Sequence, residues 1–136
     1  MAIPRHALNF LTGTVGSAYL VYRWWCSPFM RVVSMCVLLT TVIYHGAHTL
    51  GHERWANEKF MRVDVSAVVL GGIALLWITP PAAQREVCII LGLSLAIWLP
   101  TFGPLKGITF NPLLSVCHGL GVVGHLHAIA HVCEGS

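Results

Sequence analysis

Long apolar runs separated by short polar stretches dominate the hydropathy pattern of this 136-residue chain. A helix needs about 20 mostly apolar residues to span a bilayer. Four runs fit this requirement well and a fifth, at the N-terminus, is weaker because threonine, serine and glycine interrupt it. We therefore predict an all-α, polytopic membrane helix bundle with four to five transmembrane helices in a single domain, residues 1–136. The predicted spans are 7–25, 29–52, 63–79, 86–101 and 110–132.

The composition supports a membrane location. The chain is 56% hydrophobic and 10% charged, whereas about a quarter of the residues of a soluble domain are charged. So few charges cannot cover a water-facing surface. The net charge of +3 is no indication of nucleic-acid binding, and the loops between the spans are too short for a soluble domain. The first ten residues, MAIPRHALNF, contain no convincing signal-peptide cleavage site.

The cysteines give no sign of a disulfide framework. They are scattered, form no CxxC pair and are odd in number. Most lie inside apolar runs, where cysteine behaves as a small hydrophobic residue. We therefore expect packing roles for Cys26, Cys36, Cys88, Cys117 and Cys133.

Charges and tryptophans at the segment ends indicate the orientation. We call the side of the membrane that holds the N-terminus side X and the opposite side Y. Five cationic side chains are predicted on side X and three on side Y, a bias that favours X as the cytoplasmic or mitochondrial matrix side. The tryptophans fall near segment ends, as in the aromatic belt at the headgroup level: Trp24, Trp25, Trp55, Trp77 and Trp98.

Histidines form stripes on two predicted helices. Residues three, four and seven apart share a helix face. His45, His48 and His52 therefore form one stripe near side X. On the last helix His118 and His125 form a second stripe, whereas the neighbouring pair His127 and His131 lies roughly half a turn away and near side Y. Ionisable groups inside a bilayer are costly and usually functional, although structural hydrogen bonding and proton relay are alternatives to ligation here.

Depth in the membrane distinguishes the histidines further. His45 lies roughly 10 Å from side X and His118 roughly 12 Å, at 1.5 Å per residue. The two helices run antiparallel, and glycines beside both histidines allow close approach of a flat group. The sequence therefore predicts that the two imidazoles oppose each other at one level, an arrangement suited to a b-type heme.

The second span resembles the cytochrome b membrane-anchor subunits of succinate dehydrogenase. That family carries Y-H-x6-H-x2-W, which Tyr44, His45, His52 and Trp55 match. Its first-helix motif [HN]-R-x-[TS]-G is similar to NFLTG at residues 9–13, and the family's arginines are replaced here by Phe10 and Gly51. The resemblance implies heme b bound through His45, with His52 in the motif and with His118 or a partner subunit supplying the second ligand. It also implies other membrane subunits as partners, a lipid or quinone environment, and an energy-transducing membrane such as the mitochondrial inner membrane.

A competing resemblance is to the hemolysin III and progestin–adiponectin receptor families, within a superfamily of membrane metal hydrolases. Their signature S-x3-H, an Asp on the next helix and H-x3-H on the last helix resembles TVIYH, RVDVSAVVL and HAIAH. This resemblance implies a zinc site that uses His45, Asp64, His127 and His131 and activates water for amide hydrolysis. The predicted topology argues against it, because His127 and His131 fall on side Y.

Three functions therefore stay open from the sequence. The first is a heme- or quinone-associated subunit of a respiratory electron-transfer complex. The second is a zinc-dependent membrane amidase, and the third is an accessory subunit whose histidines serve only packing. Asp64 has a simpler interpretation as well, because an acidic residue favours a helix N-terminus and the third span begins there.

Overall fold

The computed structural model is a bundle of five α-helices, and it describes residues 7–51, 58–102 and 110–135. A short 3-10 turn, η1 (Leu99–Phe102), extends the fourth helix. Four helices are long and apolar enough to cross a membrane, which indicates an integral membrane protein as predicted. The helices are α1 (Ala7–Arg23), α2 (Pro28–Leu50), α3 (Glu58–Ile78), α4 (Pro81–Trp98) and α5 (Phe110–Val132).

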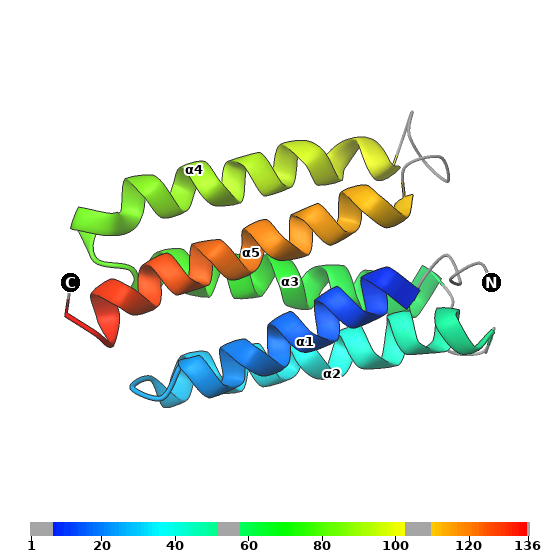
Figure 1. The fold of residues 1–136 in the computed structure, drawn as a ribbon, viewed down its shortest axis with the longest axis horizontal. Coiled ribbons are helices and arrows are strands. Elements are labelled where there is room, and N and C mark those ends of the chain that lie inside the picture. The colour runs from blue at the N-terminus through cyan, green and yellow to red at the C-terminus, as the bar shows by residue number, and fades with distance from the viewer. Residues whose placement is uncertain (1–6, 52–57, 103–109, 136) are drawn as a thin grey trace.

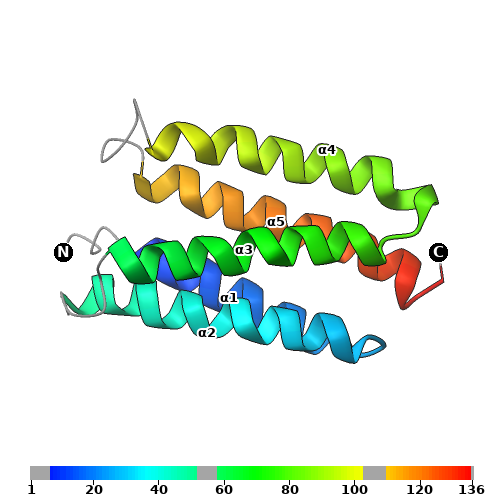
Figure 2. The ribbon, with the colours of Figure 1, turned by 180° about the vertical axis from the view of Figure 1, so that it is seen from behind.

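The helices alternate in direction along the chain, so α1, α3 and α5 run one way and α2 and α4 the other (Figure 1). The beginning of α1 and the end of α2 therefore lie on side X, and the C-terminus of the chain lies on side Y. α1 packs against both α2 and α5, although α5 is far away in the sequence. α4 packs mainly on α5, and α3 mainly on α2, so α3 and α4 touch only sparingly (Figure 2).

Polar and small residues hold α1 in the bundle. Asn9, Gly13 and Ser17 recur every fourth residue and are all buried, so they form one stripe that faces the other helices. The threonine and glycine content that weakened this segment as a transmembrane prediction is thus its packing face. The helix has 17 residues, about 26 Å at 1.5 Å per residue.

Two helices begin earlier than the hydropathy pattern predicts. α3 starts at Glu58 instead of residue 63, and α4 starts at Pro81 instead of residue 86. Both early turns carry charged residues, which a hydropathy criterion assigns to loops although a helix continues through the headgroup region. Proline suits the first position of α4 because its missing N–H would have no partner there. Asp64 is consequently well inside α3, and the interpretation of Asp64 as the beginning of the helix is wrong.

The apolar core occupies the Y half of the bundle. Five of its fully buried side chains come from α2 to α5 and from the turn after α1, namely Trp24, Met30, Leu75, Val87 and Ile129. The prediction of a headgroup position is wrong for Trp24, which is completely buried. Trp25 and Trp77 are exposed, as the prediction requires.

A disulfide closes the Y end of the bundle, against the sequence-based expectation. Cys26, in the turn between α1 and α2, bonds Cys133, which directly follows α5. Beside it, the Arg23 guanidinium donates to a carboxylate oxygen of Glu134 at 2.6 Å. The expectation failed because the two cysteines lie 107 residues apart, and only the packing of α1 against α5 brings them together.

Candidate functional site

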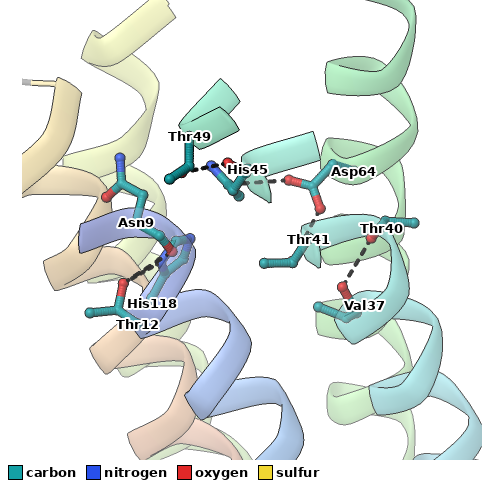
Figure 3. Close-up of polar contacts among 9 residues, drawn as sticks. All are labelled: Asn9, Thr12, Val37, Thr40, Thr41, His45, Thr49, Asp64 and His118. Atoms are coloured by element: carbon teal, nitrogen blue, oxygen red, sulfur yellow. Dashed lines mark hydrogen bonds and ion pairs between the residues drawn. The ribbon is translucent and has the colours of Figure 1, made fainter. Parts of the chain in front are cut away.

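Buried and half-buried polar side chains from four helices gather in the X half of the bundle (Figure 3). α2 and α3 supply a histidine, a threonine and a carboxylate. α5 supplies a second histidine, and α1 supplies the threonine that contacts it. The residues that carry the polar contacts are Asn9, Thr12, Thr41, His45, Asp64, Ser115 and His118. Because a polar group buried without a hydrogen bond is costly, this concentration in a membrane bundle marks a candidate site.

His45 lies against Asp64. The Nε2 atom of His45 is 3.6 Å from Oδ2 of Asp64, and the Thr41 hydroxyl donates to Oδ1 of the same carboxylate at 3.2 Å. All three residues are buried, with His45 only 4% and Asp64 6% exposed. Thr41 and His45 share a face of α2 because they are four residues apart. The structure therefore brings together the α2 and α3 part of the predicted zinc site.

His118 is held by Thr12 of α1, whose Oγ1 lies 2.9 Å from Nδ1 of the ring. The Thr12 hydroxyl also lies 2.9 Å from the carbonyl oxygen of Leu8, one turn earlier. A hydroxyl has one proton, and a helical threonine commonly donates it to the carbonyl four residues back. Thr12 then accepts a hydrogen bond from Nδ1–H of His118, which assigns the lone pair of the neutral ring to Nε2.

The two histidines contact each other as predicted. The ring centroids of His45 and His118 are 5.7 Å apart, with the ring planes at 81°. The prediction from helix depth is thus confirmed. Gly13 of α1 makes this approach possible, because a Cβ atom there would lie 2.7 Å from Cγ2 of Thr41 and 3.3 Å from Cε1 of His118.

Asn9 and Ser115 are site residues that the sequence did not predict. The Ser115 hydroxyl donates to Oδ1 of Asn9 at 2.9 Å, and Asn9 is fully buried. Ser115 and His118 are three residues apart on α5 and therefore share a helix face, and the same holds for Asn9 and Thr12 on α1. The Ser115–Asn9 and His118–Thr12 contacts thus join the same face of α5 to the same face of α1. The polar residues of the first span were the available signal for these contacts.

A cavity of about 400 Å³ runs along the bundle axis beside the histidine pair. All five helices line it, and its walls are largely apolar. Gly72 and Gly121 keep it open, because a Cβ atom at either position would meet no atom within 4 Å. His45, Asp64 and His118 stand at its X end, and His125 lines it further toward side Y.

The other histidines of α5 lie apart from this cluster. His127 is nine residues beyond His118 and His131 thirteen, roughly 13 and 20 Å along the helix at 1.5 Å per residue. His131 Nδ1 instead donates to the backbone carbonyl of His127 at 3.0 Å. Within the described ranges 7–51, 58–102 and 110–135, no group of three histidine, cysteine or acidic side chains could hold a metal ion. The four residues of the predicted zinc site are therefore not brought together.

His125 has a separate role in the Y half. The Nε1–H of Trp24 donates to its Nδ1 at 3.0 Å. Because an indole nitrogen is only a donor, the neutral imidazole of His125 carries its proton on Nε2. His52, the third residue predicted for the heme site, and Trp55 lie outside the described residues.

No protein-family model, curated protein or solved structure matches this chain.

Proposed function

We propose that this chain is a small integral membrane subunit of a respiratory, succinate dehydrogenase-like electron-transfer complex and that it binds heme b between His45 and His118. One observation carries the proposal, namely the 5.7 Å separation of the two ring centroids on antiparallel helices. Other membrane subunits of the complex are the partners, because many large apolar side chains of the bundle face outward. Lipid, and a quinone where the complex reduces one, completes the surroundings.

The donor set fits a heme iron. Histidine is a common ligand of heme iron, and His45 and His118 place two imidazole donors side by side, with ring centroids 5.7 Å apart. Ligating histidines almost always have their second ring nitrogen oriented by a hydrogen-bonding neighbour. Thr12 stands in this position at His118, where the tautomer leaves Nε2 as the nitrogen that would bind the iron. At His45 the Asp64 carboxylate lies 3.6 Å from Nε2, which is an ion-pair distance.

The protein environment suits one-electron chemistry, which heme b supplies when bound. A largely apolar cavity lies beside the histidines, and burial and hydrogen bonding around its ligands tune a heme's potential. Asp64 places a carboxylate next to His45 and makes that ring a stronger electron donor. Thr12, Thr41 and Asp64 thus orient the ligating rings and set their basicity.

The orientation in the membrane follows from the disulfide. Structural disulfides persist where the compartment is oxidising, so we infer that the Y end, with Cys26 and Cys133, faces such a compartment. Side X is then the cytoplasm or the mitochondrial matrix, in agreement with the excess of cationic residues that the sequence predicts for that side. The histidine pair would lie nearer the compartment where soluble donors such as NADH and succinate are oxidised. This arrangement suits an energy-transducing membrane such as the mitochondrial inner membrane.

The test is an absorbance measurement on the purified protein, as isolated and after titration with hemin. We expect a Soret band whose reduced-minus-oxidised difference is that of a bis-histidine b-type heme. His45→Leu and His118→Leu should each abolish it, because one imidazole cannot supply both axial ligands. His127→Leu is the matched control on the same helix as His118 and should retain the band.

Two outcomes would contradict the proposal. One is the absence of any heme difference band before and after hemin addition, which would leave the accessory role. The other is stoichiometric zinc in elemental analysis that is lost in His127→Leu, which would restore the hydrolase interpretation. Thr41, His45 and Asp64 do lie together as that interpretation requires, but the distance of His127 and His131 from them opposes it.

A further inference from the structure

A second hollow lies on the outside of the bundle, along the seam between α2 and α3. It is an open groove of about 930 Å³, and its lining is almost entirely apolar. Small side chains form its middle, among them Cys36, Ser66, Ala67 and Ala74. Larger exposed side chains flank it, including Val63 and Leu70. The groove therefore offers an apolar surface on the outside of the bundle.

Two cations stand at the X mouth of this groove. Lys59 and Arg62 both line it, and they lie three residues apart in the first turns of α3, on one helix face. Both side chains are exposed. Positive charge thus meets an apolar channel at the level of the lipid headgroups.

We propose that the α2–α3 groove binds an anionic phospholipid of the X leaflet, with its phosphate at Lys59 and Arg62 and an acyl chain along the groove. Clusters of basic residues at the cytoplasmic or matrix surface are the usual recognition element for such lipids. The charge at the mouth selects an anionic lipid over a zwitterionic one. A partner helix would need an acidic residue at the same level, whereas lipid phosphates are always present there.

The length of the groove agrees with one lipid leaflet. Val37 of α2 lies opposite Gly71 of α3, because a Cβ atom at Gly71 would be 3.4 Å from Cγ2 of Val37. Cys36, next to Val37, is thus at the level of Leu70 and Gly71, roughly 13 Å from Arg62 at 1.5 Å per residue. One leaflet of the hydrocarbon core is about 15 Å thick, so the end of the acyl chain reaches Cys36.

The rate at which Cys36 is labelled can show whether the lipid occupies the groove. It is an exposed free cysteine in the groove, and Cys88 on α4 is an exposed free cysteine outside the groove. In nanodiscs of phosphatidylglycerol we expect a lipid-soluble maleimide to label Cys36 several-fold more slowly than in phosphatidylcholine nanodiscs with the same acyl chains. The rate for Cys88 should be equal in both, because α4 does not line the groove.

Charge removal completes the experiment. Lys59→Gln with Arg62→Gln should make the Cys36 rates equal in the two lipids, whereas Arg31→Gln with Arg85→Gln, on side Y, should leave the difference unchanged. Native mass spectrometry should show phosphatidylglycerol retained by the parent and by the side-Y variant only. Equal Cys36 rates in the two lipids for the parent protein would overturn the proposal. Retention of the difference in the Lys59/Arg62 variant would also overturn it. The heme measurement is independent of both results.

Discussion

The two ends of the bundle are stabilised by different interactions. The Y half contains the fully buried apolar side chains, the disulfide of Cys26 with Cys133 and the Arg23–Glu134 ion pair. The X half instead contains the polar cluster around His45, Asp64 and His118, beside an open cavity (Figure 3). The stabilising interactions are therefore concentrated in the Y half and the polar side chains in the X half.

This difference has a physical reason. Tight apolar packing and a covalent link give stability without any need for a ligand. Buried ionisable groups cost stability unless they are satisfied, so a bundle can carry them only where other parts supply the cohesion. We expect changes at the Y end to act on folding, and changes at the X end to act on the site as well.

The largest effect on folding should come from the disulfide. Cys133→Ser opens a link between residues 107 apart, and loss of such a loop constraint typically costs about 2–4 kcal/mol. The free energy of unfolding, measured by titration with sodium dodecyl sulfate, should fall by that amount. The heme band should survive under native conditions. Cys88→Ser, at an exposed free cysteine, should change neither the free energy of unfolding nor the heme band. An equal effect of the two variants would show that the disulfide does not stabilise the Y end.

Alanine substitutions at Gly13 and Gly121 should distinguish a closely packed position from an open one. In Gly13→Ala the new methyl group would lie 2.7 Å from Cγ2 of Thr41, so one of the two must shift, and such overpacking costs about 1–3 kcal/mol. In Gly121→Ala the methyl group enters open space, and alanine favours a helix over glycine by up to about 1 kcal/mol. The same denaturant titration should show opposite signs. If both variants are stabilised, α1 does not approach His118 as closely as described.

Removal of the Asp64 carboxylate tests whether the stability of the polar cluster depends on this hydrogen-bond acceptor. Asp64→Ala deprives Thr41 and His45 of their buried partner, at a cost of about 1–2 kcal/mol. Asp64→Asn keeps an oxygen that can accept from Thr41 and should cost less. Circular dichroism during detergent titration measures the ranking. Equal effects of the two variants would show that the acceptor oxygen is unimportant.

The smallest effect should come from the indole of Trp24. Trp24→Phe retains most of the buried ring and removes the N–H donated to His125, and hydrogen bonds between membrane helices average about 0.6 kcal/mol. The comparison is Trp77→Phe at an exposed position, which should leave the free energy of unfolding unchanged. A larger loss in Trp77→Phe would mean that the indoles act through the lipid and not through His125.

Much of the site could be predicted from the sequence because it depends on local geometry. Helix periodicity places Thr41 and His45 on one face, and the alternation of spans fixes the depth of each histidine. The common depth of His45 and His118 could therefore be predicted, whereas their contact also required that the two histidine faces turn toward each other in the bundle. The same arithmetic predicted that His127 and His131 would be too far away, and the structure agrees.

The sequence by itself determined the all-helical membrane architecture, the direction of each span and the level of each histidine, because hydrophobicity and helical rise act along the chain. Only the tertiary structure decided which helices are neighbours. The contacts of Thr12 with His118, Trp24 with His125 and Cys26 with Cys133 all join α1 or the turn after it to α5 or its C-terminal end, more than 100 residues away. Each helix is apolar on most sides, so hydropathy does not specify its lateral partners; close packing at glycines and the satisfaction of buried polar groups do.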